Sequence, residues 1–166
     1  MKGIKYVLLD WGGTIGKTGC RRHFVKTGKG LLPNSFRALK QLRRKYDLGI
    51  LSNTDVSDKH MAAGLKRSKL TGVFSVQVYS SDKGMCSKPC QPIFQRAWAA
   101  IKKRHPGIQK GQVMYVGNNY FHDVVPAWRF GFKTTLVSNG DDDIIYRLAR
   151  LAGVQDKAVE NICDLF

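Results

Sequence analysis

The sequence of 166 residues predicts a three-layer α/β fold built on a doubly wound parallel sheet of about five strands. Two observations lead to this prediction. Short β-rich runs alternate along the chain with stretches of helical periodicity, which is typical of parallel strands joined by crossover helices. The runs at residues 7–9 and 113–116 consist only of apolar and aromatic residues, as expected for strands covered by helices on both faces. The length fits a single domain over residues 1–166.

The strands are expected at residues 5–9, 48–52, 75–79, 112–116 and 133–137. A first helix should begin at Asn34 or Ser35, either of which can cap it. Its buried stripe is expected at Phe36, Leu39, Leu42 and Tyr46. Further helices are expected at residues 57–67, 92–104, 123–130 and 142–152. This order of strands and helices is Rossmann-like.

The composition limits where the protein can act. Hydrophobic residues make up 43% of the chain, but no apolar run reaches the ~20 residues that a membrane span needs. Strand-like sequence starts at Lys5 with no secretory signal before it, so a cytoplasmic protein is expected. The four cysteines are then expected to be reduced thiols.

The chain is strongly basic, with a net charge of +16, and the charge is uneven. Residues 15–50 hold ten Lys or Arg and one acid, Asp47, a net charge of +9. Within this stretch, residues 16–32 are rich in Gly, Lys and Arg and are predicted to form an irregular basic loop beside the crevice at the carboxyl ends of the strands, where an active site is expected. Such an excess attracts polyanions, so nucleic acid is a candidate partner through residues 17–45. A solubilising surface is the alternative.

The first strand ends in a carboxylate, Asp10, followed by a glycine pair and Thr14. The carboxyl edge of a first parallel strand is where open α/β sheets place their ligands. The step from Asp10 to Thr14 resembles the Asp-x-Asp-Gly-Thr motif of the haloacid dehalogenase (HAD) superfamily, with Gly12 in place of the second aspartate.

Three further motifs of that superfamily are matched in order. Ser52 and Asn53 at the end of the second strand resemble the second motif. The run at residues 86–94, which contains Lys88 and Pro89, resembles the third. Residues 116–119 followed by Asp123 resemble the fourth, with Asn118 in place of its first acid. The resemblance covers essentially the whole chain and implies a HAD-like domain, but the chain has no room for a cap domain.

The resemblance implies a set of roles. Asp10 corresponds to the nucleophile that forms an aspartyl-phosphate, Ser52 to a hydroxyl that binds a phosphoryl oxygen, and Lys88 to the lysine that neutralises phosphate charge. Asp10, the Gly12 carbonyl, Asn118 and Asp123 correspond to the Mg²⁺ ligands. The neighbouring positions expected to contact substrate are Thr14, Asn53 and Gly117.

Gly12 and Asn118 leave two functions open. Glycine cannot act as the general acid and base, which contributes ~10²–10⁴-fold to such reactions. The first function is a slow Mg²⁺-dependent phosphohydrolase that acts on a bulky or polyanionic phosphoester. The second is a catalytically inactive HAD-like pseudoenzyme that serves as a basic module for RNA or a ribonucleoprotein.

Overall fold

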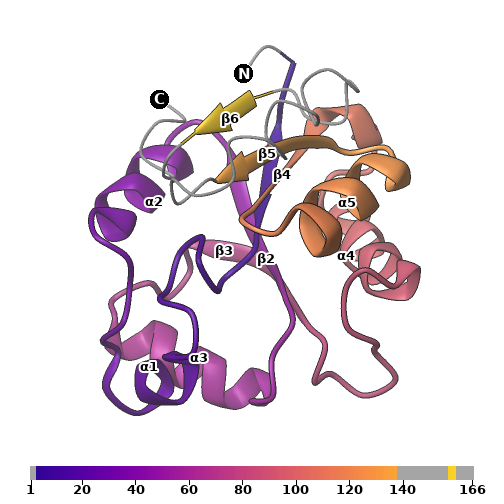
Figure 1. The fold of residues 1–166 in the computed structure, drawn as a ribbon. Helices are drawn as coiled ribbons and strands as arrows, with labels where there is room; N and C mark the ends of the chain where they lie inside the picture. The colour runs from indigo at the N-terminus through magenta and orange to yellow at the C-terminus, as the bar shows by residue number, and fades with distance from the viewer. Residues whose placement is uncertain (1–2, 138–156, 160–166) are drawn as a thin grey trace.

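In a computed structural model, the chain forms a parallel sheet between two layers of helices (Figure 1). The structure describes residues 3–137 and the strand at 157–159. The strand order is β3-β2-β1-β4-β5-β6, and all five pairings are parallel. The strands are β1 (Tyr6–Leu9), β2 (Asp47–Ser52), β3 (Phe74–Tyr79), β4 (Val113–Gly117), β5 (Lys133–Val137) and β6 (Lys157–Val159). The predicted doubly wound parallel sheet is confirmed.

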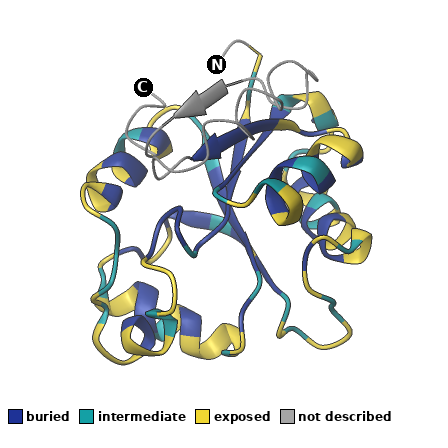
Figure 2. Ribbon diagram, in the orientation of Figure 1, coloured by how far each residue is buried: buried dark blue, intermediate teal, exposed yellow. Residues whose placement is uncertain are grey.

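Helices cover the sheet on both sides. They are α1 (Arg21–Thr27), α2 (Ser35–Arg43), α3 (Asp58–Arg67), α4 (Gln91–Arg104) and α5 (Val125–Phe130). A 3₁₀ turn, η1 (Lys110–Gln112), precedes β4, and a π-helical turn, η2 (Tyr120–Val124), leads into α5. Helices α1–α3 pack on one face of the sheet, while α4 and α5 pack on the other. Figure 2 shows the sheet and the inner helix faces buried, with exposed residues outside.

Strand β1 shows why the sequence folds this way. Its four residues are all buried, and they alternate between two cores. Val7 and Leu9 face the core of α1–α3, whereas Tyr6 and Leu8 face the core of α4 and α5. A strand buried on both sides has to be apolar throughout, which is the pattern read from the sequence.

Strand β1 also marks the switch point of the sheet. From it the chain moves outward through β2 and β3, then returns to β4 on the other side of β1. The crossovers therefore diverge between β1 and β4, and a crevice is expected at the carboxyl ends of these two strands. Asp10 follows β1 directly, and its backbone N–H donates to the Val116 carbonyl at 2.8 Å, which ties the two strand ends together.

The sheet has one strand more than the five that were located from the sequence, because the three residues of β6 are too few to carry a periodic signal. Three other expectations need correction. The segment 16–32 is not wholly irregular, since α1 lies inside it and buries Phe24 and Val25. Phe36 is 38% exposed, and Ala38 is buried with Leu39 and Leu42. Cys86 and Cys90 form a disulfide with a Cα–Cα distance of 6.2 Å, so these two cysteines are not free thiols.

The other predicted elements are found within a few residues of their expected ends. The predicted helix at 123–130 is η2 followed by α5. The helix expected at 142–152 lies outside the described residues. No described helix has both the length and the apolar character needed to span a membrane.

Candidate active site

Three charged side chains meet at the carboxyl end of the sheet. The Lys88 ammonium donates to Asp10 Oδ1 at 2.7 Å and to Asp123 Oδ1 at 2.5 Å. Asp10 comes from the end of β1, Asp123 from η2, and Lys88 from the loop before α4. All three are buried, with exposed fractions of 6%, 1% and 4% respectively. Buried charges are stable only when paired, so these ion pairs fix the positions of three loops relative to one another.

A tyrosine from the sheet completes this cluster. The Tyr115 hydroxyl accepts a hydrogen bond from the Lys88 ammonium at 2.9 Å. Its own proton can be donated to Asp123 Oδ1 at 3.0 Å or to the Leu51 carbonyl at 3.2 Å. Tyr115 is fully buried in β4, and burial raises the pKa of its hydroxyl well above the ordinary value. The hydroxyl therefore stays neutral and serves as a fixed hydrogen-bonding group.

Burial and the neighbouring carboxylates shift the pKa of Lys88 in opposite directions. Burial alone would lower the pKa of Lys88, but the carboxylates of Asp10 and Asp123 outweigh that effect and raise it. Burial raises the pKa of Asp123, while the Lys88 ammonium opposes the rise. Lys88 is therefore a permanent cation at neutral pH, held against the carboxylate of Asp10.

Asn53 positions the lysine through the backbone. Its side-chain Nδ2 donates to the Lys88 carbonyl at 3.1 Å, and its Oδ1 accepts from the Lys88 N–H at 2.7 Å. The two hydrogen bonds connect the end of β2 to the Lys88 loop. The disulfide between Cys86 and Cys90 spans the same loop. Substrate contact by Asn53 stays a prediction, and the structure adds that its side-chain amide holds the backbone of Lys88.

Two glycines let the neighbouring loops approach closely. A Cβ on Gly117 would collide with the Asp123 carboxylate, so the end of β4 needs glycine for Asp123 to reach Lys88. Gly13 has a φ of +76°, and a Cβ there would collide with the side-chain amide of Asn118. The Asp10 loop and the Asn118 loop are therefore packed against each other.

Ser52 lies beside an arginine that the sequence did not single out. Ser52 is fully buried at the end of β2. The Arg21 side chain, from the first residue of α1, places Nη2 3.4 Å from Ser52 Oγ. Thr14 is also fully buried, and its Oγ1 has no hydrogen-bond partner.

The fold matches known structures. A HAD phosphatase from Thermococcus onnurineus superposes with a TM-score of 0.71 at 18% identity, over 98% of this chain and 96% of that chain. L-2-haloacid dehalogenase from Xanthobacter autotrophicus gives a TM-score of 0.67 at 15% identity, with coverage of 98% and 96%. The chain has the HAD fold.

A third structure with this fold contains a metal. A HAD hydrolase from Bacillus subtilis, solved bound to magnesium, gives a TM-score of 0.71 at 16% identity, over 98% of this chain and 96% of that chain. No family model matches the sequence. No curated protein matches it either.

The residues expected to bind Mg²⁺ supply oxygen ligands from two carboxylates, one amide and one backbone carbonyl. Asp10, Asp123 and Lys88 together carry one net negative charge when all three are ionised, and Asn118 and the Gly12 carbonyl would add neutral oxygen ligands. Mg²⁺ prefers oxygen ligands and one or two carboxylates, so this donor set fits it. Among the described residues, no group of three His, Cys, Asp or Glu side chains gathers at one place. The set is therefore less acidic than an all-carboxylate site.

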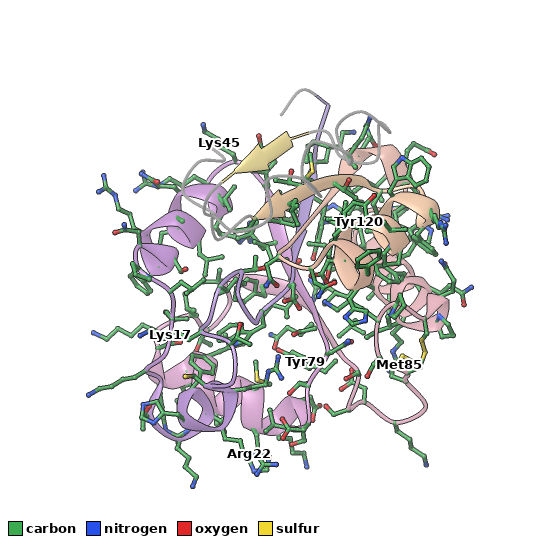
Figure 3. All side chains as sticks on the ribbon, in the orientation of Figure 1. Lys17, Arg22, Lys45, Tyr79, Met85 and Tyr120 are labelled. Atoms are coloured by element: carbon green, nitrogen blue, oxygen red, sulfur yellow. A yellow bond between two sulfur atoms is a disulfide. The ribbon has the colours of Figure 1, made fainter. Side chains whose placement is uncertain are left out.

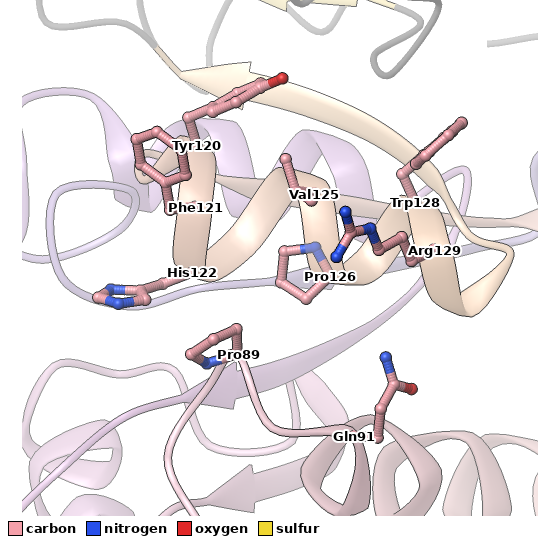
Figure 4. Close-up of a pocket in the computed structure, with 9 residues that line it drawn as sticks. All are labelled: Pro89, Gln91, Tyr120, Phe121, His122, Val125, Pro126, Trp128 and Arg129. Carbon is pink, nitrogen blue, oxygen red and sulfur yellow. The ribbon is translucent and has the colours of Figure 1, made fainter.

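An open groove lies between the loop that follows Lys88 and the helical turns η2 and α5 (Figure 4). It has a volume of about 720 Å³ and is lined by residues of the Lys88 loop, η2 and α5. Pro89 on its wall follows Lys88, and His122 precedes Asp123. Phe121 and Trp128 also line it and are 66% and 44% exposed. Large aromatic surface beside a charged site is suited to binding the organic part of a ligand.

Nearly all cations of the basic segment, residues 15–50, are exposed. Figure 3 shows Lys17, Arg22 and Lys45 at the periphery of the molecule. Nine of the ten cations in this segment are exposed: Lys17, Arg22, Lys26, Lys29, Arg37, Lys40, Arg43, Arg44 and Lys45. Arg21 alone is partly buried. Within the described chain, this segment therefore offers positive charge both to solvent and to the site.

The structure brings together Asp10, Lys88 and Asp123 by direct contact, and it places Gly117 and Asn118 against the same loops. Arg21 and Tyr115 are the residues that sequence reasoning missed. Arg21 is one of ten Lys or Arg residues in the basic segment, and nothing in the adjacent sequence sets it apart from the other nine. Tyr115 did carry a signal, because a tyrosine in an otherwise aliphatic buried strand needs a partner for its hydroxyl.

Proposed function

We propose that the protein is a phosphohydrolase that acts through an aspartyl-phosphate on Asp10. The single observation that carries the proposal is the buried contact of 2.7 Å between the Lys88 ammonium and Asp10 Oδ1. A nucleophilic carboxylate repels a phosphate dianion, and a cation fixed at that carboxylate offsets the repulsion. A purely structural ion pair would gain nothing from lying at the switch point of the sheet, where ligands bind.

The residues divide the reaction as follows. An oxygen of Asp10 attacks phosphorus, and the bond from phosphorus to the ester oxygen breaks. Lys88 balances charge on the phosphoryl group, and Ser52 binds one of its oxygens. Asp10, Asn118, Asp123 and the Gly12 carbonyl would hold Mg²⁺, which supplies further charge neutralisation when it is bound. Water then cleaves the acyl-phosphate bond and releases inorganic phosphate.

Gly12 limits the rate and the choice of substrate. No side chain at this position protonates the leaving group or activates the water, so turnover should be slow. The groove of Figure 4 is open and partly aromatic, which favours a substrate with a bulky group attached to the phosphate. We therefore expect activity on phosphoesters with large and acidic leaving groups.

The test is phosphate release from an aryl phosphate with and without Mg²⁺. The Asp10→Asn variant is the control, because it keeps the shape of the side chain and removes the nucleophile. Release that depends on both Mg²⁺ and Asp10 supports the proposal. Equal release by the two proteins contradicts it.

The exposed cations favour a second candidate function, a HAD-like module that binds RNA or a ribonucleoprotein without turnover. Arg22 pairs with Asp55 at 2.8 Å and Arg43 with Asp47 at 2.6 Å, whereas the remaining exposed cations of the segment have no ion pair among the described residues. Binding to mixed RNA should then fall steeply with salt, since phosphate contacts release counterions. Absence of binding at low salt would exclude this function.

A further inference from the structure

Arg21 differs from every other cation of the basic segment in where its charge lies. The nine others are exposed, but Arg21 is partly buried and reaches Ser52. Its neighbour Arg22 lies at the periphery (Figure 3) and donates from Nε and Nη2 to one oxygen, Asp55 Oδ2, at 3.1 and 2.8 Å. Two consecutive arginines thus have different surroundings, and one of them belongs to the site.

The Arg21 guanidinium forms no ion pair in the described part of the chain. The nearby Asp55 carboxylate pairs with Arg22 instead. The Nε of Arg21 is buried and has no hydrogen-bond partner. Arginine is always charged, and a buried donor without a partner is costly, so the arrangement is suited to an anionic ligand that would supply the missing acceptor.

Position 12 faces this guanidinium. A Cβ built on Gly12 would lie 3.6 Å from Arg21 Nη2, an ordinary contact distance. An aspartate at this position would place its carboxylate against the arginine and neutralise it. Because residue 12 is glycine, no carboxylate at this position neutralises the guanidinium of Arg21.

We propose that Arg21 binds the leaving group and selects phosphoanhydrides over alkyl phosphate esters, a proposal that rests on the phosphohydrolase function above. The carboxylate of Asp10 attacks the terminal phosphorus, and the bond from that phosphorus to the bridging oxygen breaks. The electron pair stays on the bridging oxygen, which departs as part of a phosphate anion and needs no proton. Arg21 stabilises this anion electrostatically. Water then hydrolyses the aspartyl-phosphate, and the proton it loses goes to solvent.

An alkoxide leaving group is different, because it is a strong base and requires a proton as it departs. No residue at position 12 supplies one. A phosphoanhydride also carries additional negative charge on the leaving side, which complements Arg21. The site therefore disfavours alkyl phosphate esters and favours phosphoanhydrides.

The experiment measures binding separately from turnover. Calorimetric titration with sodium pyrophosphate and with sodium phosphate is done on the Asp10→Asn protein, which cannot form the acyl-phosphate. Adding Arg21→Gln to that protein should weaken pyrophosphate binding about tenfold or more, as expected for the loss of a charged hydrogen bond. Adding Arg22→Gln instead should change it less than about twofold, since a surface ion pair contributes little. Equal effects of the two variants, or no binding of pyrophosphate to the Asp10→Asn protein, would overturn the proposal.

Turnover provides the second measurement. The unmodified protein with Mg²⁺ should release phosphate faster from pyrophosphate than from glycerol phosphate, and Arg21→Gln should reduce that preference. A faster reaction with glycerol phosphate would refute the selection of phosphoanhydrides. The failure of the proposed function would look different, because aryl phosphate would then not be hydrolysed in an Asp10-dependent way. Thermal unfolding of each variant verifies that it is folded.

Discussion

Asn53 holds Lys88 by two hydrogen bonds between its side-chain amide and the backbone of the lysine, at 3.1 and 2.7 Å. The pair joins residues from two loops that are far apart in the sequence. Since the ammonium of Lys88 reaches both Asp10 and Asp123, Asn53 determines the geometry of all three indirectly. It is a positioning residue of this site.

Asn53→Ala should therefore reduce stability and activity together. The variant leaves a backbone donor and acceptor of Lys88 unpaired in a half-buried place, which costs about 1–3 kcal/mol of unfolding free energy. Urea unfolding measures the first effect and aryl phosphate hydrolysis the second. Gln95→Ala is the control, because Gln95 is exposed on α4 and its replacement should be nearly neutral. A variant as stable and active as the control would show that the two hydrogen bonds do not position Lys88.

Lys88→Met should produce a stability loss that depends on pH. The variant leaves Asp10 and Asp123 buried without their cation, which costs about 3–5 kcal/mol near neutral pH. Burial raises the pKa of Asp123, and in the parent protein Lys88 opposes this rise. Without Lys88 the pKa should rise further above its unfolded value. A carboxyl with a raised pKa in the folded state contributes stability at low pH and loses it as the pH increases.

The stability difference between the parent and Lys88→Met should accordingly be largest near pH 8 and shrink towards pH 5, where the buried carboxylate of Asp123 takes up a proton. Chemical denaturation at a series of pH values measures it. The exposed Lys103 on α4 provides the control through Lys103→Met, which should show a small difference at all pH values. A Lys88→Met deficit that is independent of pH would contradict the charged cluster.

The sequence predicted the sheet and most of the helices because apolar strands and amphipathic helices leave periodic patterns. It also placed Asp10, Lys88 and Asp123 at one rim, since each follows or precedes a strand or helix end in a parallel sheet. The contact between Arg21 and Ser52 could not be predicted from the sequence, because it depends on the orientation of α1 relative to the sheet. The seven residues of α1 lie in a stretch rich in Gly, Lys and Arg, where local propensity favours a loop.

Gly13→Ala should be more destabilising than a matched glycine substitution. Gly13 and Gly19 have φ of +76° and +74°, so alanine is strained by a similar amount at both positions, about 1–2 kcal/mol. Only at Gly13 would the added Cβ collide, and it would meet the side chain of Asn118. The Cβ at Gly19 has no neighbour within 4 Å. The difference between the two variants in urea unfolding isolates the collision, and equal losses would mean that the two loops are not packed together.

Phe121→Ala should raise KM for a phosphoester with a large aromatic group by about twofold to twelvefold, because a ring contact of about 0.5–1.5 kcal/mol is lost. Naphthyl phosphate and methyl phosphate are suitable as the large and small substrates, and KM for methyl phosphate should stay the same. Phe36→Ala is the control, because Phe36 is another exposed aromatic residue but lies on α2, outside the groove. Equal KM values for the Phe121 and Phe36 variants would remove the groove from substrate binding.

Gly12→Asp should shift the substrate preference of the site from phosphoanhydrides towards alkyl phosphate esters. The position accepts a side chain, since a Cβ there meets only Arg21 Nη2 at 3.6 Å. The new carboxyl could protonate an alkoxide leaving group and activate water, so hydrolysis of glycerol phosphate should rise by at least tenfold, within the ~10²–10⁴ that such catalysis can contribute. Its carboxylate would at the same time pair with Arg21 and weaken pyrophosphate binding.

Gly12→Asn is the matched control, because asparagine has the same shape but cannot transfer a proton. It should leave glycerol phosphate hydrolysis unchanged and weaken pyrophosphate binding less than aspartate does. Steady-state phosphate release and calorimetric titration measure the two effects. If aspartate and asparagine gave the same rates, the missing acid at position 12 would not be what limits turnover, and a different step would have to be rate-limiting.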